Sequence, residues 1–257
     1  MRKLLALQAR VIGALVMRET RATFGTSQIG YLWAIVTPAA GVAVLVSVFV
    51  AAGRLPPFGS SLALFFATGL LTLELFTKLS TSLMNTFTAN KALLTYPLIK
   101  ETDTLFARFI LIVTTYLVIM LIFYSGLILM GLASLPRFPD QLLYAFSATA
   151  LLGFGFGALN AVLLARWESW GLIYGILTRP LFIISGVFFI PSKLPTPALD
   201  VLKWNPVLHA VEWMRSGYYS NYDSMVLDKG YMVFLASLLI LLGLAGERFT
   251  RKKRSGQ

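Results

Sequence analysis

The sequence predicts an all-α integral membrane protein with six transmembrane helices. Two observations carry this prediction: the composition, and the long runs without charge. Of the 257 residues, 57% are hydrophobic and 13% are charged, whereas an ordinary soluble domain carries about 25% charged residues. The mean hydropathy is +0.76. So few charged side chains cannot cover the surface of a soluble globule of 28.3 kDa.

The uncharged runs place the six spans. A bilayer core of about 30 Å is crossed by about 20 apolar helical residues. The runs, trimmed at turn signals, predict spans at 33–52, 61–83, 106–132, 141–165, 169–190 and 230–247. The second span contains Glu74 and Lys78 one helical turn apart, so these two charges can neutralise each other. The fifth contains Arg179 beside Pro180. Because an unpaired charge inside a bilayer is costly, we expect Arg179 to face a protein interior or a water-filled path.

Residues 1–30 predict a basic amphipathic helix rather than a signal peptide. A signal peptide has an unbroken apolar stretch, and here Arg10, Arg18, Glu19 and Arg21 interrupt it. On a helical wheel, Lys3, Arg10, Arg18 and Arg21 share one sector, and apolar residues fill the opposite side. Such a helix is expected to lie in the plane of the membrane interface. The permease domain would then occupy 31–247, and a basic tail would occupy 248–257.

The distribution of the net charge of +11 predicts the topology. Residues 1–32 carry five basic residues and one acidic residue, and so does the tail from Glu247. The connection 191–229 is balanced, with four of each. Because basic residues near span ends stay in the cytoplasm, both termini and 85–105 are predicted to be cytoplasmic, and 191–229 to face outward. The basic excess flanks spans instead of a soluble domain, which disfavours nucleic acid as a partner.

Several chemistries are missing from the sequence. It has no Cys and one His, so Cys/His metal sites are unavailable. It has no HExxH, no GxSxG and no Gly-Lys pair, so a phosphate-binding loop is absent as well. We therefore predict no catalytic residue, metal site or cofactor in this chain. A transport function leads, and an intramembrane enzyme acting on lipid-linked sugars is the alternative from another class. Glycine pairs four residues apart at Gly153–Gly157 and Gly171–Gly175 predict close helix packing.

Four stretches of the sequence carry a family resemblance. They are Arg18–Gly25 with Ile29–Ile35 and Pro38, then Ala89–Tyr96 with Asp103–Arg108, then Pro180–Pro191, and Trp204–Glu212 with Arg215. Their order and spacing resemble the membrane subunit of type-2 ABC exporters, and more narrowly the KpsM-like permeases that export capsular polysaccharide. The resemblance extends from about residue 15 to 247. Permeases for O-antigen and teichoic acid share this plan, so a sibling exporter of these substrates or of a small lipophile remains an alternative.

The resemblance implies partners and a location. It implies a homodimer in a bacterial inner membrane, joined by two ATP-binding ABC subunits that hold ATP and Mg. It also implies a lipid-linked acidic polysaccharide as substrate and periplasmic or outer-membrane polysaccharide export proteins as further partners. A coupling segment at 85–104 would sit in a cleft of the ATPase, and the alternative is an ordinary turn between spans. The residues expected in that contact are Asn90, Lys91, Leu93, Leu94 and Tyr96.

The resemblance also suggests a substrate path. Relatives carry a Leu-Gly pair beside the lateral entrance for the glycan, where this chain has Ile29-Gly30. The nearby aromatic rings can stack on sugars, or they can form an interfacial aromatic belt. Four prolines and short apolar pieces in 191–229 predict short re-entrant helices before the last span, which in the family gate the exit. A peripheral loop is the alternative. The expected path residues are Ile29, Gly30, Tyr31, Trp33, Arg179, Trp204, Asn205, Pro206, His209 and Trp213.

Overall fold

The computed structural model describes residues 2–25, 28–96 and 99–255, and every regular element in these ranges is helical. The predicted all-α class is therefore confirmed for this part of the chain. The helices are α1 (Arg2–Phe24), α2 (Gln28–Ala51), α3 (Leu62–Met84), α4 (Thr86–Ala89), η1 (Leu93–Thr95), α5 (Glu101–Leu129), α6 (Pro139–Arg166), α7 (Trp170–Thr178), α8 (Leu181–Ile184), η2 (Pro191–Lys193), α9 (Thr196–Leu202), α10 (Pro206–Tyr218) and α11 (Lys229–Ser255).

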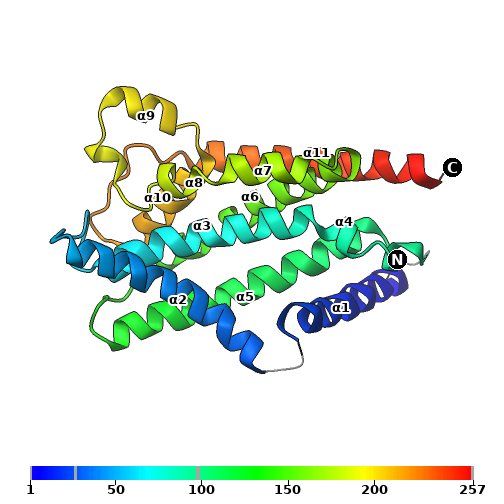
Figure 1. Cartoon of the computed structure of the whole chain (residues 1–257), viewed down its shortest axis with the longest axis horizontal. Coiled ribbons are helices and arrows are strands. Elements are labelled where there is room, and N and C mark those ends of the chain that lie inside the picture. Colours follow the sequence, from blue (N-terminus) through cyan, green and yellow to red (C-terminus); the bar gives the residue numbers. More distant parts are fainter. Residues whose placement is uncertain (1, 26–27, 97–98, 256–257) are drawn as a thin grey trace.

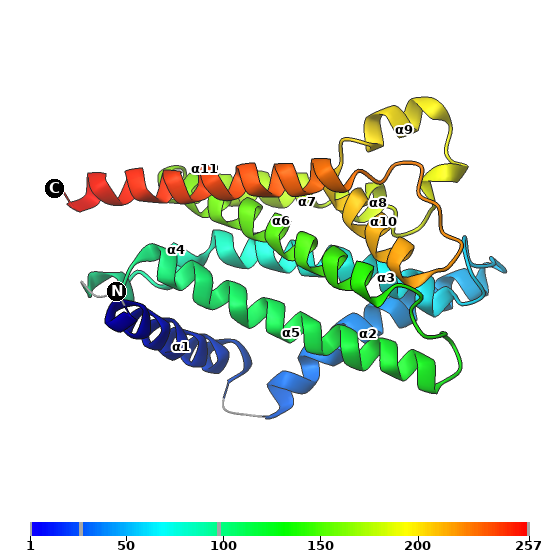
Figure 2. The ribbon, with the colours of Figure 1, turned by 180° about the vertical axis from the view of Figure 1, so that it is seen from behind.

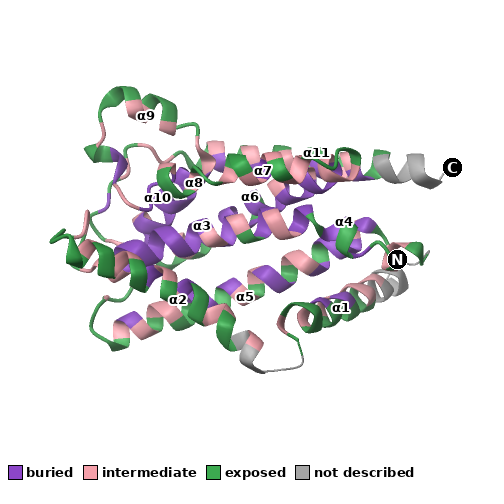
Figure 3. Cartoon of the chain, viewed as in Figure 1, coloured by how far each residue is buried: buried purple, intermediate pink, exposed green. Residues whose placement is uncertain are grey.

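The long helices form an elongated bundle with two distinct ends (Figure 1). One end carries α4 and both chain termini, and we call it the α4 end. The other carries α9 and the loops around it, and we call it the α9 end. The view from behind shows the same arrangement (Figure 2). Helices α3 and α6 pack against each other at the centre, and α10 and α11 pack on α6. Buried residues are concentrated along α3, α6 and α10 (Figure 3).

Among the described residues, five helices are long and apolar enough to cross a membrane. They cover Leu32–Ala51, Leu62–Met84, Glu101–Leu129, Pro139–Arg166 and Lys229–Phe249. These ranges correspond to the first, second, third, fourth and sixth predicted spans. The sequence therefore located each of these five helices to within a few residues, because charged residues flank the apolar runs.

The fifth predicted span, 169–190, differs from a single spanning helix. The structure has the two short helices α7 and α8 here, which together cover Trp170–Ile184. At 1.5 Å per residue this pair is about 22 Å long, shorter than the bilayer core of about 30 Å. The regular helix stops at Arg179 and Pro180, where proline cannot donate a backbone hydrogen bond. The helical path ends at Gly186, whose φ of +77° suits glycine.

Helix α1 has the predicted amphipathic character and packs on the bundle. Its apolar face is turned inward, and Leu15 is buried. Gln8 donates a hydrogen bond to Asp103 at the start of α5, and Phe24 lines a groove together with Thr115 of α5. Asp103 and Thr115 are about 18 Å apart along the axis of α5. Helix α1 therefore lies lengthwise along α5.

The glycine pair on α6 allows the close approach of α3, as predicted. A Cβ atom added at Gly153 would lie 2.7 Å from the Leu79 Cβ, and one at Gly157 would lie 2.5 Å from the Leu83 Cβ. Both distances are shorter than a carbon–carbon contact. The other predicted pair does not serve this purpose within one chain, because Gly175 has no heavy atom within 4 Å of such a Cβ.

We predict that Gly157→Ala destabilises the bundle. The added methyl group forces Leu83 or the α3 backbone to move, at a cost of about 1–3 kcal/mol. The matched control is Gly126→Ala on α5, where a Cβ atom meets nothing within 4 Å and alanine favours the helix by up to about 1 kcal/mol. Thermal melting of the purified protein in detergent should show a lower midpoint for Gly157→Ala than for the unmodified protein. The midpoint of Gly126→Ala should not be lowered. Equal midpoints would contradict the packing argument.

Candidate functional site

A groove of about 400 Å³ lies between the end of α1, the first half of α2, α3 and the middle of α5. Gly30 and Trp33, both predicted on the substrate path, line this groove. Glu74 and Lys78 of the second span line it too. The structure therefore brings together an exposed aromatic ring and two charged groups that the sequence singled out separately.

The close approach of the end of α1 to the start of α2 explains why residue 30 is a glycine. A Cβ atom added at Gly30 would lie 2.1 Å from the carbonyl oxygen of Phe24. Any larger residue would therefore push the end of α1 away from the start of α2. Ile29 and Tyr31 belong to α2, but their side chains lie outside the described part of the structure.

Glu74 and Lys78 do not form the ion pair that their spacing allows. The salt bridges found among the described residues, with a limit of 4.0 Å, do not join these two side chains. Glu74 is half-buried and Lys78 is exposed. The groove therefore offers a separate cation and a separate anion to a ligand, at positions that a span otherwise fills with apolar side chains.

A second polar centre lies at the α9 end, around the buried guanidinium of Arg215. This side chain is 0% exposed and lies 3.9 Å from the ring centroid of Phe65 on α3. Its Nη1 donates to the Phe189 carbonyl at 3.2 Å, and its Nη2 donates to the Val187 carbonyl at 3.4 Å. Nη1 is also 3.6 Å from Glu212 Oε1. Arg215 thus ties α10 to α3 and to the turn that follows α8.

Glu212 extends this centre into the loop between α10 and α11. Its Oε1 accepts a hydrogen bond from the Tyr222 hydroxyl at 2.6 Å, and its Oε2 accepts one from Ser224 Oγ at 2.6 Å. Burial and, next, the negative charge of Glu212 raise the pKa of Tyr222, so the hydroxyl stays protonated and remains a donor. Glu212 and Arg215 therefore both have defined partners, as buried charges require.

The predicted path residues at the α9 end mostly hold helices together. Asn205 caps α10 by accepting from the Val207 backbone N–H at 3.0 Å, and its Nδ2 donates to Ser185 Oγ at 3.0 Å. Pro206 is the first residue of α10. Trp213 donates to Gln141 Oε1 at 3.1 Å. These contacts assign Asn205 and Trp213 a packing role in this conformation.

Two hydrogen bonds hold the ring of His209 in this arrangement. Its Nδ1 accepts a hydrogen bond from the Asp228 backbone N–H at 3.0 Å. The proton must therefore sit on Nε2, which lies 2.8 Å from the Lys203 carbonyl oxygen and donates to it. Two other predicted path residues behave differently: Trp204 is 67% exposed and Arg179 is exposed. The structure does not bring Arg179 or Trp204 to the groove that contains Gly30 and Trp33.

The predicted coupling segment presents a mixed surface at the α4 end. Lys91 and Tyr96 are exposed, and Leu93 and Leu94 are partly exposed on the short helix η1. Asn90 differs, because it is 1% exposed and faces the bundle. Its Nδ2 donates to the Thr86 carbonyl at 3.0 Å and its Oδ1 accepts from Arg18 Nη1 at 2.5 Å. Four of the five predicted coupling residues are thus available to a partner, and Asn90 holds the segment in place.

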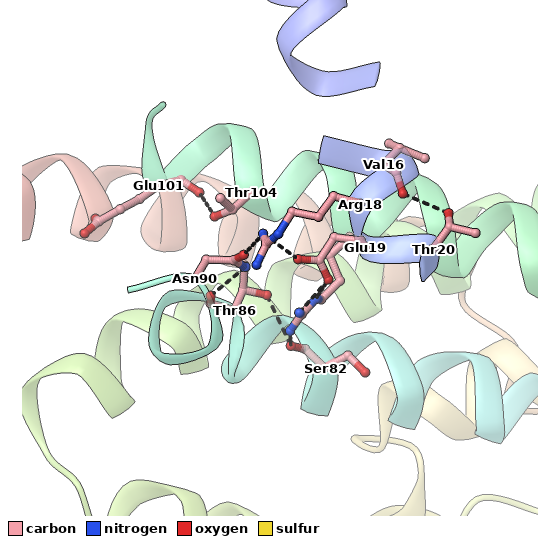
Figure 4. Close-up of polar contacts among 10 residues, drawn as sticks. Val16, Arg18, Glu19, Thr20, Ser82, Thr86, Asn90, Glu101 and Thr104 are labelled. Atoms are coloured by element: carbon pink, nitrogen blue, oxygen red, sulfur yellow. Dashed lines mark hydrogen bonds and ion pairs between the residues drawn. The ribbon is translucent and has the colours of Figure 1, made fainter. Parts of the chain in front are cut away.

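A polar cluster beneath this segment was not predicted (Figure 4). Glu19 of α1 is 3% exposed. Its Oε2 accepts from Arg108 Nε at 2.9 Å and from Arg108 Nη2 at 2.6 Å. Arg108 Nη1 also donates to the Ser82 carbonyl at 3.2 Å. One feature of the sequence indicates this cluster: Glu19 is an acidic residue in the middle of the apolar face of α1. Glu212 and Arg215, three residues apart in an apolar helix, gave a similar signal.

The bundle, with five described helices long and apolar enough to cross a membrane, defines the class of a polytopic membrane protein. The sequence profile of the family described as ABC-2 type transporter matches residues 10–219. This match covers well over half of the chain. The protein therefore belongs to the ABC-2 type transporter family.

Three relatives are similar over nearly the whole chain. The capsule polysaccharide export inner-membrane protein BexB of Haemophilus influenzae is 30% identical over 242 residues, which cover 93% of this chain and 91% of BexB. The capsule polysaccharide export inner-membrane protein CtrC of Neisseria meningitidis is 30% identical over 244 residues, with 94% and 91% covered. The polysialic acid transport protein KpsM of Escherichia coli is 28% identical over 245 residues, with 93% of each chain covered.

We predict that Arg215→Met loosens the α9 end of the bundle. Methionine fills much of the space but leaves Glu212 without its cation, and removing one partner of a buried pair costs about 3–5 kcal/mol. Arg137→Met is the control, because Arg137 is exposed at the same end, and such changes usually stay within about 0.5 kcal/mol. Thermal melting in detergent is the measurement. A wild-type midpoint in the Arg215 variant would show that the pair is dispensable.

Proposed function

We propose that this chain is the permease of an ATP-driven exporter that moves lipid-linked capsular polysaccharide across an inner membrane. It works as a homodimer with two ATP-binding ABC subunits, which hold the ATP and Mg. The near full-length similarity to three capsule export and polysialic acid transport proteins carries this proposal. The absence of a Gly-Lys pair from the sequence supports a separate ATPase chain. The names of the relatives favour capsular polysaccharide over the O-antigen, teichoic acid, lipophile and intramembrane-enzyme alternatives.

The proposed topology has six crossings with both termini in the cytoplasm. The α4 end carries both chain termini and the coupling segment, and the α9 end carries α9 and α10 (Figure 1). The basic residues at both termini favour the α4 end as the cytoplasmic one. The helix pair α7–α8 with residues 185–190 makes the fifth crossing. Helices α9 and α10 then form the outward gate, where envelope export proteins dock.

The groove between α1, α2, α3 and α5 is the proposed entrance for the substrate. Lys78 supplies a cation for a phosphate or carboxylate of the acidic glycolipid, and Glu74 supplies an acceptor for sugar hydroxyls. The indole of Trp33 is 61% exposed and offers an aromatic face to a sugar ring. Because the groove opens beside apolar helices, a lipid anchor can stay in the bilayer while its head group enters.

The proposed function has a direct genetic and biochemical test. Deletion of the gene should abolish surface capsule while polysaccharide accumulates inside the cell, and a plasmid copy of the chain should restore export. The purified chain should bring down an ABC ATPase in a one-to-one ratio. Normal surface capsule in the deletion strain, or a chain that never associates with such an ATPase, would refute the exporter.

We predict opposite accessibility for two single cysteines. The chain has no native cysteine, and Ser220 and Thr95 are both exposed. A membrane-impermeant maleimide applied from outside should label Ser220→Cys in spheroplasts and should label Thr95→Cys only after lysis. The unmodified chain is the matched control for background labelling. The reverse pattern would contradict the six-crossing topology.

A further inference from the structure

Two adjacent residues of α1 hold α5 and the coupling segment. The Glu19 carboxylate binds the Arg108 guanidinium of α5 through hydrogen bonds of 2.6 and 2.9 Å. The next residue back, Arg18, donates to Asn90 at 2.5 Å, and Asn90 is the residue that fixes the coupling segment to the bundle. One turn of α1 is therefore joined to both α5 and the coupling segment (Figure 4).

The burial of this cluster makes it a strong mechanical link. The Glu19 side chain is 4% exposed and the Arg108 side chain is 17% exposed. An ion pair with this little solvent is weakly screened, and loss of one partner leaves an uncompensated charge. Arg108 also binds the Ser82 carbonyl near the end of α3 at 3.2 Å. The link thus holds α1, α3 and α5 at the point where the coupling segment begins.

The other end of α1 forms a wall of the proposed entrance. Thr23 and Phe24 line the groove of about 400 Å³. Phe24 and Thr20 also line a second groove of about 370 Å³ against α5. Because Glu19 and Phe24 belong to one continuous helix, a displacement of the Glu19 turn moves Phe24, about 7.5 Å further along the axis.

We propose that Glu19 is a positioning residue that couples movement of the ATPase-docking segment to the mouth of the substrate groove. This inference rests on the proposed function. A partner that binds Lys91 and Tyr96 displaces Asn90, and the contact of Asn90 with Arg18 passes the displacement to α1. The Glu19–Arg108 pair sets the two positions that α1 takes along α5. ATP binding drives this change only to the extent that the ATPase binds one position more tightly than the other.

The decisive variant is Glu19→Gln in the complete complex with its ATPase. Glutamine keeps the size of the side chain but removes the charge that holds Arg108. We expect normal assembly and basal ATP hydrolysis, with the polysaccharide exported per ATP lowered by about tenfold, within the usual range of coupling between sites. Glu168→Gln is the matched control, because Glu168 is exposed in the connection between α6 and α7. An unchanged export ratio in the Glu19 variant would overturn the proposal.

A distance measurement separates coupling from stability. Spin labels at Thr23→Cys and Thr114→Cys report the position of the end of α1 on α5, and both residues are exposed. A non-hydrolysable ATP analogue should change this distance in the wild-type background but not with Glu19→Gln. An equal change in both backgrounds would overturn the proposal.

A second variant keeps the test decisive if Glu19→Gln fails to assemble. Arg18 has a side chain that is 44% exposed, so Arg18→Gln should fold, and it should lower export per ATP by a smaller factor. A wild-type ratio in this variant would overturn the proposal. If the unmodified complex shows neither export nor an ATP-dependent distance change, the proposed function itself has failed.

Discussion

The bundle depends on the rule that a charge buried among apolar helices must have a partner. Two ion pairs follow this rule, one near each end. At the α9 end, Arg215 pairs with Glu212. Arg215 also lies against Phe65 and binds the carbonyls after α8. At the α4 end, Glu19 binds Arg108. Apolar packing has no direction and leaves helices free to slide or rotate. Each ion pair requires its two partners to lie side by side, so it restricts how the helices align.

Between these two ion pairs, α3 packs closely against one side of the bundle and loosely against the other. The contact of α3 with α6 is close because glycines at 153 and 157 admit Leu79 and Leu83. The contact of α3 with α2 and α5 is looser and leaves a groove lined by Glu74 and Lys78. A transport protein needs both properties, because a rigid centre gives the moving parts a fixed reference and an open groove admits a ligand.

The sequence predicted the helices well and their contacts poorly, for a physical reason. Charged residues flank apolar runs, so the ranges of α2, α3, α5, α6 and α11 could be predicted locally. The helical period shows which face of α1 is buried, but not that this face lies along α5, because the partner is distant in sequence. Glu19 and Arg108 are 89 positions apart, and no local pattern joins them. The break after α7 was visible as Arg179-Pro180, yet its effect depends on neighbouring helices.

The net charge of +11 also has a structural explanation beyond topology. Among the described residues, five of the eleven acidic side chains are buried: Glu19, Glu101, Asp103, Glu212 and Glu247. Of the basic side chains whose burial the structure describes, Arg215 alone is buried. Three of these buried acidic residues, Glu19, Asp103 and Glu212, serve as acceptors at helix contacts. The basic residues of the described part remain largely on the surface. A count of charges thus overstates the acidic groups that are available to a partner.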